Sequence, residues 1–256
     1  MNKSVTNSTR GGGFLINTSS PEEVVTPDDL SNEHELIREM TTQFVETEVV
    51  PYIQEIETKN WEITKSLLRR CGELGLLGIE VPAKYGGEDL DKVSAMIVQE
   101  ELGRVGSFAV SYGGQAGIGT LPIVYFGTEQ QKLEYLPRFC KGELFTSYAL
   151  SEAGSGSDAL AASARALWDQ STKQWVLNGE KMWITNAAFA DVFITFAQVD
   201  GNQFSCFIAE KAHSGVSVGT EEEKMGLLGS STSTVVFDNA KLPSDNLLGE
   251  IGKGHR

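Results

Sequence analysis

The chain contains few of the residues that build metal centres and disulfide frameworks. Its 256 residues include three cysteines and three histidines. Cys71, Cys140 and Cys206 lie far apart and form no CxxC pair, which argues against a disulfide framework and against a zinc site. The histidines are scattered in the same way and show no ligand spacing. We therefore expect reduced, structural thiols and no metal.

Basic residues are also in the minority, with 21 lysines and arginines against 35 aspartates and glutamates and a formal net charge of −14. A surface of this sign repels phosphate backbones and anionic lipids, so neither nucleic-acid binding nor membrane-surface binding is expected. No apolar run reaches the roughly 18 residues of a spanning helix, so no transmembrane segment is expected either. A small phosphorylated ligand stays compatible, because helix ends or a few cations can override the mean field.

Hydrophobic periodicity divides the chain into parts. Residues 1–30 are rich in Ser, Thr and Gly and are expected to form a flexible arm. Residues 31–142 show helical spacing, and residues 143–250 show short alternating runs typical of strands. Residues 251–256, Gly-punctuated and basic, are expected to lead into a further domain absent from this sequence. The predicted fold class is α+β: an N-terminal all-α helical domain followed by a β-barrel or sandwich-like domain.

Local signals refine both halves. Ser31 or Asn32 can cap a first helix, and a Thr-x-x-Gln pattern at residue 128 predicts the start of another. A helix is also expected over residues 107–126, although it contains many glycines. In the β half, Asn178-Gly179 stands between two apolar runs and predicts a tight hairpin turn.

The most informative segment is residues 148–158, Tyr-Ala-Leu-Ser-Glu-Ala-Gly-Ser-Gly-Ser-Asp. A predicted strand runs into a loop of small residues and hydroxyls, whose backbone amides can approach an oxygen-rich ligand closely. The segment matches neither the Walker loop nor GxGxxG. Taken alone, a loop of this composition after a strand is more often an ordinary turn than a ligand site.

A second segment covers residues 179–186, Gly-Glu-Lys-Met-Trp-Ile-Thr-Asn. Strand alternation places Trp183 and Thr185 on one face. An indole beside a hydroxyl suits a planar, heteroatom-edged cofactor such as a flavin, while the alternative is a core tryptophan on an ordinary strand.

Together the two segments resemble the acyl-CoA dehydrogenase family. Residues 148–158 are similar to the family signature, and residues 181–186 are similar to its second flavin-contact strand. The similarity extends over nearly the whole chain from about residue 33, through Leu-Gly-Leu-Leu-Gly at 74–78, to Leu-Leu-Gly at 247–249. Within the family, the chain most resembles the long- and very-long-chain branch and its bacterial relatives.

The resemblance implies FAD as cofactor and assigns contacts to it. The implied FAD-binding residues are Tyr148, Leu150, Ser151, Gly156, Ser157, Trp183, Ile184 and Thr185. Among them, Leu150 acts through its backbone, the Ser151 hydroxyl bonds the isoalloxazine edge, Trp183 packs on the rings and Thr185 bonds near N5. Gly156 and Ser157 meet the pyrophosphate.

Some implied features go beyond the flavin. Ser157 also contacts the CoA part of the substrate. Leu228 departs from the basic residue that relatives of this branch often carry, whereas Ala153 in place of Pro should matter little. The glycines around Gly117 have three possible explanations: close packing of helices, a break in this helix, or a deep slot for a long acyl tail.

The implied activity is α,β-dehydrogenation of acyl-CoA in fatty-acid β-oxidation. The implied partners are the acyl-CoA substrate, an electron-transferring flavoprotein as electron acceptor, and further copies of the chain in a homodimer or homotetramer. The implied compartment is the bacterial cytoplasm or the mitochondrial matrix. The catalytic base is expected in the absent C-terminal domain, so no residue of this chain is assigned as catalytic. Glu152, inside the signature, is expected to bond backbone or a basic neighbour instead.

Two other functions stay open at this point. An acyl-CoA oxidase or nitroalkane-type oxidase of the same fold would pass electrons to oxygen. A non-enzymatic assembly factor of a respiratory complex could have lost FAD altogether.

Overall fold

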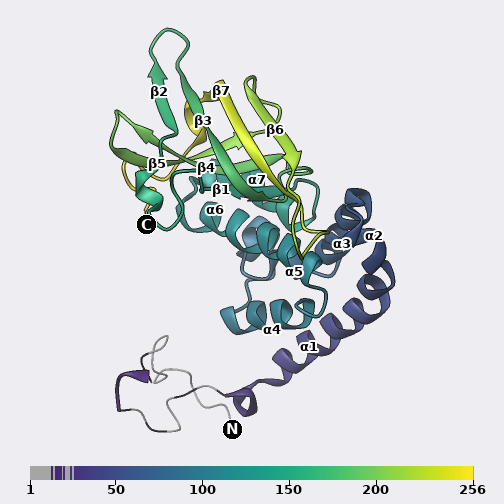
Figure 1. Ribbon diagram of the computed structural model, residues 1–256. Coiled ribbons are helices and arrows are strands. Elements are labelled where there is room, and N and C mark those ends of the chain that lie inside the picture. The colour runs from purple at the N-terminus through teal and green to yellow at the C-terminus, as the bar shows by residue number, and fades with distance from the viewer. Residues whose placement is uncertain (1–12, 14, 19, 21–23, 25, 256) are drawn as a thin grey trace.

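The computed structural model describes residues 13, 15–18, 20, 24 and 26–255. Most of the predicted arm, residues 1–30, lies outside the described residues. The described chain forms a helical part followed by a β part, and Figure 1 shows the helices gathered on one side of the sheet. The predicted order, helices first and strands second, is therefore confirmed.

The helical part contains the longer helices and several short turns. The α-helices are α1 (Asn32–Phe44), α2 (Ile53–Glu57), α3 (Trp61–Glu73), α4 (Lys92–Leu102), α5 (Gly106–Tyr112), α6 (Leu121–Phe126) and α7 (Glu129–Cys140). Two π-helical segments, η5 (Val45–Val49) and η9 (Gly113–Gly119), continue α1 and α5. The single helix predicted over residues 107–126 is wrong, because η9 separates α5 from α6.

Predicted capping signals start two of these helices. The Ser31 hydroxyl accepts the amide of His34, and the His34 ring accepts the amide of Ser31. At α7, Thr128 and Gln131 exchange the same pair of bonds. Each cap satisfies amides that the helix itself leaves unpaired.

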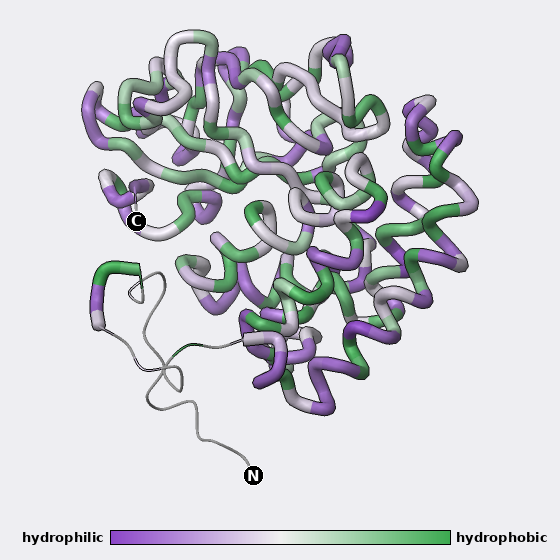
Figure 2. Tube along the Cα trace, turned by 60° about the horizontal axis from the view of Figure 1, so that its bottom comes forward, coloured by the Kyte–Doolittle hydropathy of each residue, from purple (hydrophilic) through white to green (hydrophobic). Residues whose placement is uncertain are grey.

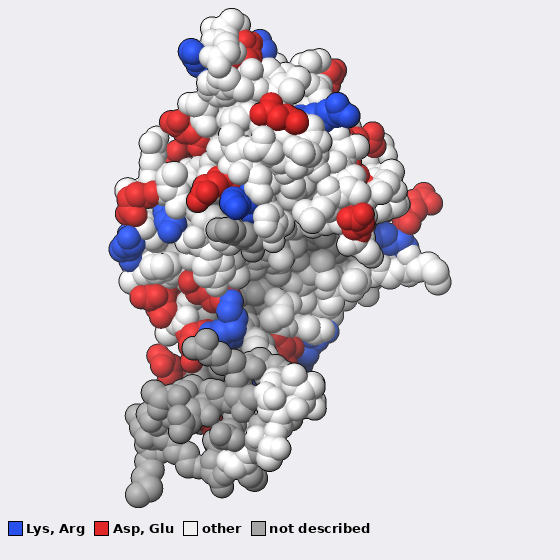
Figure 3. Space-filling view, turned by 90° about the vertical axis from the view of Figure 1, so that its left-hand side faces the viewer, with Lys and Arg blue, Asp and Glu red and all other residues white. Residues whose placement is uncertain are grey.

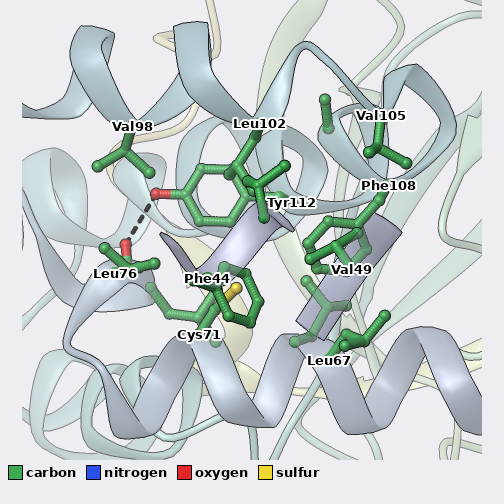
Figure 4. Close-up of a cluster of buried hydrophobic side chains, with 14 of the residues drawn as sticks. Phe44, Val49, Leu67, Cys71, Leu76, Val98, Leu102, Val105, Phe108 and Tyr112 are labelled. Atoms are coloured by element: carbon green, nitrogen blue, oxygen red, sulfur yellow. Dashed lines mark hydrogen bonds between the residues drawn. The ribbon is translucent and has the colours of Figure 1, made fainter. Parts of the chain in front are cut away.

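An apolar cluster holds the helices together. Phe44, Cys71, Leu102 and Phe108 are buried in it, and Figure 4 shows their side chains converging from four helices. The hydroxyl of Tyr112 donates to the Leu76 carbonyl at 2.8 Å, so the one polar tip in this view is satisfied. Hydrophilic and hydrophobic residues alternate along the helices, as amphipathic packing requires (Figure 2).

The β part is an eight-stranded, mainly antiparallel sheet. Its strands are β1 (Thr146–Ala149), β2 (Arg165–Asp169), β3 (Gln174–Thr185), β4 (Val192–Val199), β5 (Gln203–Glu210), β6 (Val216–Glu221), β7 (Thr232–Pro243) and β8 (Leu247–Leu248). The strand order is β6-β7-β3-β2-β4-β5-β8, with β1 pairing in parallel with the first half of β4. The end strands β6 and β8 do not pair with each other, so the sheet is open; of the two predicted forms, barrel or sandwich-like, a closed barrel is excluded.

The hairpin predicted at Asn178-Gly179 is also wrong. These residues lie inside the continuous strand β3, where the pairing with β7 shifts register between Leu177 and Gly179. Gly179 has φ +150°, and a Cβ there would lie 2.6 Å from the Cβ of Ala164. The dipeptide therefore forms a β-bulge. The hairpin turn that joins β2 to β3 lies at residues 170–173.

Polar contacts join the two parts. The Gln115 side chain in η9 accepts the amide of Thr146 at 2.7 Å, and the Asn186 side chain donates to the Ser111 carbonyl at 2.9 Å. An apolar cluster that includes Ile123, Phe139 and Ile194 fills the space between α6, α7 and the sheet. Strand β1 is thus fixed against η9 and the end of β3 against α5, which places the two informative segments beside the helical part.

Hydropathy and surface charge can also be described for this part of the chain. No helix in the described part of the chain combines the length and hydropathy of a membrane span. On the face in Figure 3, basic and acidic side chains lie interspersed, with uncharged residues between them.

Candidate functional site

The first segment leaves strand β1 and closes into a tight turn. Main-chain bonds of 2.9 and 3.1 Å pair Glu152 with Ser155, and the Ser155 hydroxyl donates to the Asp158 carbonyl. Gly154 and Gly156 lie at the exposed side of this turn, and a Cβ on either would meet nothing within 4 Å. Their backbone is therefore open to a ligand approaching from outside.

The second segment contains a bulge centred on Trp183. Register with β7 shifts between Lys181 and Ile184, and Trp183 has φ +64°. A bulky residue in this region costs about 1–2 kcal/mol, so the conformation is an outlier that invites a functional explanation. The Trp183 side chain is 57% exposed, whereas Ile184 is buried. The alternative of a core tryptophan is thereby excluded.

The structure brings the two segments into contact. The amide of Met182 donates to the Ser151 carbonyl at 2.8 Å, and the Lys181 ammonium donates to the Leu150 carbonyl at 3.1 Å. Thr185 lies farther along β3, and its carbonyl accepts the hydroxyl of Ser147 from β1. Residues predicted to share a site thus occupy one stretch of surface where β1 and β3 meet.

Several polar groups in this stretch have no protein partner. Among the described residues, nothing bonds the Ser151 amide or hydroxyl, the Trp183 indole N–H or the Thr185 hydroxyl. Ser151 and Thr185 are half-buried. An exposed ring flanked by unpaired donors and open glycine backbone suits a planar cofactor with acceptor atoms on its edge and phosphates behind it. The residues present therefore fit a flavin nucleotide.

Glu152 faces away from that surface, as predicted. Its Oε2 accepts the amide and hydroxyl of Ser163 at 2.7 and 2.6 Å, and its Oε1 accepts the amide of Ala164 at 3.1 Å. Lys181 completes the set at 2.7 Å. Burial alone would raise the pKa of Glu152, but the bonds from Lys181 and Ser163 outweigh it and hold the pKa below its ordinary value.

A pocket of about 570 Å³ lies beside the first segment. It is bordered by α6, β1 and the end of the chain, and its lining includes Gly117, Tyr125, Tyr148, Phe196 and Gly249. The chain-terminal segment contributes Lys253. Tyr148 is the one predicted cofactor residue that lines this space, which makes the pocket continuous with the first segment.

A second pocket of about 200 Å³ lies between α4 and η9 and also reaches Gly117. The glycines of η9 have different surroundings. A Cβ on Gly114 would lie 2.8 Å from the side-chain nitrogen Nδ2 of Asn186. A Cβ on Gly119 would lie 2.5 Å from the carbonyl oxygen of Gly114. A Cβ on Gly117 would meet nothing within 4 Å. Close packing therefore explains Gly114 and Gly119, while Gly117 opens onto both pockets.

Of the three cysteines, Cys206 lies in the wall of the 570 Å³ pocket. All three are free and buried, and burial raises the pKa of Cys140 to about 11. Among the described residues, no group of His, Cys, Asp and Glu has the geometry to hold a metal ion.

Comparison with known proteins identifies the family. Residues 31–143 match the acyl-CoA dehydrogenase N-terminal domain, and residues 147–240 match the acyl-CoA dehydrogenase middle domain. The chain belongs to the acyl-CoA dehydrogenase family. Matching regions cover both the helical part and the sheet, so the site lies where two family domains meet.

Individual relatives agree with this assignment. The chain is 52% identical over 246 residues to a "Probable acyl-CoA dehydrogenase" of Bacillus subtilis (strain 168), covering 96% of this chain and 41% of the relative. It is 35% identical over 233 residues to the "Short-chain specific acyl-CoA dehydrogenase, mitochondrial" of Rattus norvegicus, covering 89% of this chain and 56% of the relative. A crystal structure of an acyl-CoA dehydrogenase complexed with FAD from Bacillus anthracis superposes with a TM-score of 0.94 at 50% identity, covering 97% of this chain and 42% of that one. The acyl-CoA dehydrogenase chain thus spans about half the length of these relatives.

Proposed function

We propose that the chain supplies the flavin-contact region and part of the acyl-CoA site of an acyl-CoA dehydrogenase. The observation that carries the proposal is the contact between residues 148–158 and residues 179–186. In this contact the Met182 amide donates a 2.8 Å hydrogen bond to the Ser151 carbonyl. FAD is the proposed cofactor, and the similarity to a structure complexed with FAD supports it. The substrate is acyl-CoA, converted to the trans-2-enoyl-CoA in fatty-acid β-oxidation.

When bound, FAD would supply the redox chemistry by accepting a hydride from the acyl chain. The chain's own residues bind and orient. Trp183 packs on the ring system, and Ser151 and Thr185 donate hydrogen bonds to its edge. Gly156 and Ser157 hold the pyrophosphate, and Ser157 also contacts CoA. Tyr148, Leu150 and Ile184 complete the contact surface. The base that removes the α-proton is proposed to lie outside this chain.

A long acyl chain is the proposed substrate because of Gly117. A pocket of about 570 Å³ exceeds what a four-carbon chain fills, and the bare backbone at Gly117 gives access to a further 200 Å³ beside α4. A side chain at this position would occupy the junction. The relatives include enzymes named for short and branched acyl chains, so activity across acyl chain lengths is the test of this proposal.

The proposed partners follow from the same assignment. An electron-transferring flavoprotein is the proposed electron acceptor, and similarity to a structure of the electron transferring flavoprotein of Acidaminococcus fermentans, with a TM-score of 0.83 at 33% identity, supports it. A homodimer or homotetramer is the proposed assembly, in the bacterial cytoplasm or the mitochondrial matrix.

One experiment tests the enzyme. The chain is extended at its C-terminus by the remaining segment of the B. subtilis relative, purified, and examined for yellow colour and bound FAD. Acyl-CoAs of four to eighteen carbons are then offered with a reducible dye. We expect bound FAD and dye reduction that peaks with long chains. A colourless, inactive protein would contradict the proposal.

The same preparation separates the alternative functions. An oxidase consumes oxygen with acyl-CoA or a nitroalkane and needs no dye. An assembly factor stays colourless and co-purifies with subunits of a respiratory complex. The unpaired donors beside Trp183 favour a flavin-binding protein over this last alternative.

A further inference from the structure

The sheet contains a buried ion pair directly behind the proposed flavin surface. The side chain of Lys181 is fully buried and that of Glu152 is 5% exposed, with Nζ and Oε1 2.7 Å apart. Removing two charges from water is costly, and apolar side chains of the same size would stabilise a sheet at least as well. Stability alone therefore does not explain the Lys181–Glu152 ion pair, and the pair is a candidate for a functional role.

Lys181 also bonds the backbone of the flavin segment. Its ammonium donates to the Leu150 carbonyl at 3.1 Å. That carbonyl belongs to the same peptide group as the Ser151 amide, for which the described residues offer no acceptor. A charge-assisted bond at the oxygen polarises the peptide and makes its N–H a stronger donor.

Glu152 keeps the ammonium in position. Its carboxylate is itself held by Ser163 and Ala164, at distances between 2.6 and 3.1 Å. The following carbonyl, that of Ser151, is fixed by the Met182 amide. Lys181 and Met182 thus hold two successive carbonyls of the loop from one strand, and Trp183 is the next residue on that strand.

We propose that Lys181, held by Glu152, is a positioning residue for the flavin. It orients the peptide between Leu150 and Ser151, and strengthens the Ser151 amide as a donor to an acceptor atom on the flavin edge. It also fixes the strand from which Trp183 projects. The inference rests on the proposed function, because it takes FAD to be the ligand of this surface.

The test compares affinity for FAD with stability. Lys181→Met keeps the length of the side chain and removes the donor, but it leaves Glu152 buried and unpaired. The double variant Lys181→Met with Glu152→Gln removes both charges and keeps the Gln oxygen as acceptor for Ser163, so it avoids the buried unpaired charge without restoring the bond to Leu150. Tyr135→Phe is the matched control, because it deletes a part-buried 2.7 Å bond to Glu210 that involves none of the proposed flavin contacts.

Each protein, extended by the C-terminal segment of the B. subtilis relative, is stripped of flavin and titrated with FAD. Urea unfolding and the absorption band of the bound flavin are recorded in parallel. We expect the double variant to unfold at a higher urea midpoint than Lys181→Met alone, to bind FAD about tenfold more weakly than the parent, as for the loss of one good hydrogen bond, and to shift the flavin band toward that of free FAD. Tyr135→Phe should change neither affinity nor band.

Two outcomes overturn the inference. If the double variant binds FAD as tightly as the parent with an unchanged band, the pair serves stability alone. If Ser151→Ala and Trp183→Ala also leave FAD affinity unchanged, the proposed flavin surface fails together with this inference. Weakened binding in those two variants, beside an unaffected double variant, would refute the role of Lys181 and leave the proposed function standing.

Discussion

The amide of Met182 donates a 2.8 Å hydrogen bond to the carbonyl of Ser151, and this bond joins two segments that are distant in sequence. Ser151 follows strand β1, whereas Met182 precedes the bulge of strand β3. The hydroxyl of one segment and the indole of the other therefore keep a fixed relative position before any ligand arrives. Pre-organisation of this kind reduces the ordering cost of binding.

Removing either side chain should weaken FAD binding. Ser151→Ala deletes one hydrogen bond and Trp183→Ala deletes one packing surface, each contributing on the order of 1–3 kcal/mol. We expect FAD occupancy after purification to fall in both variants of the extended protein. Leu167→Ala is the control, because Leu167 on β2 is also 57% exposed but lies outside the site. Unchanged occupancy in both test variants would show that these residues do not bind FAD.

Gly117→Leu should shift substrate preference toward short acyl-CoAs. The new side chain would stand at the junction of the two pockets without striking a neighbour within 4 Å at its Cβ, so the fold should tolerate it. The measurement is kcat/KM across acyl chain lengths. Gly226→Leu, at an equally open glycine outside both pockets, should leave the profile unmoved. A profile that Gly117→Leu does not alter would place the acyl slot elsewhere.

The 256-residue chain alone should not dehydrogenate acyl-CoA. Its signature carboxylate, Glu152, already accepts bonds from Ser163, Ala164 and Lys181, and its lowered pKa makes it a weak base. The measurement is anaerobic mixing of FAD-loaded chain with a long-chain acyl-CoA while flavin absorbance is followed. We expect no bleaching until the C-terminal segment is appended. Rapid bleaching by the short chain, abolished by Glu152→Gln, would identify Glu152 as the base.

His213 should make stability depend on pH on the acidic side of neutrality. Burial lowers the pKa of His213, and its Nδ1 accepts the Glu210 amide at 3.1 Å, which requires the neutral ring. The unfolded chain therefore binds the proton more readily, with a pKa of about 6.5. Stability from this group is complete above that value and is lost as pH falls through the lower folded pKa.

The check is urea unfolding of the parent and of His213→Asn, whose side-chain oxygen can accept the same amide. The difference in unfolding free energy between the two should change between pH 8 and pH 5, in the direction that favours the variant at pH 5. A difference that stays constant over this range would contradict the assignment.

Much of the fold was predictable where local chemistry decides. Ser31 and Thr128 start helices because a hydroxyl followed by a polar acceptor three residues later satisfies the first amides in any context. The β-rich second half followed from alternation. The proximity of residues 148–158 to residues 181–186 followed from resemblance to the family and not from pattern.

The failures arose where tertiary pairing overrides local preference. Asn178-Gly179 has the composition of a turn, but pairing with β7 keeps the strand running, and the Asn178 side chain accepts the Asn239 amide instead of capping a hairpin. The π-helical segment η9 has no periodic signature, since its bonds span five residues and its glycines carry no side chains. The Lys181–Glu152 pair was foreseen only as some basic neighbour, because alternation gives a face but no partner.

The π-helical turn at η9 also has an evolutionary consequence. Such a turn holds one residue more than an α-helical path between the same ends, so a single deletion within residues 113–119 can return the segment to regular geometry. The helices on either side would keep their orientation, and only the side chains within the segment would change direction. Gly117 would leave the junction of the two pockets without any substitution in their walls. A lineage could in this way change the shape of the cavity by a change in length, with the sheet and its ligand-facing residues untouched.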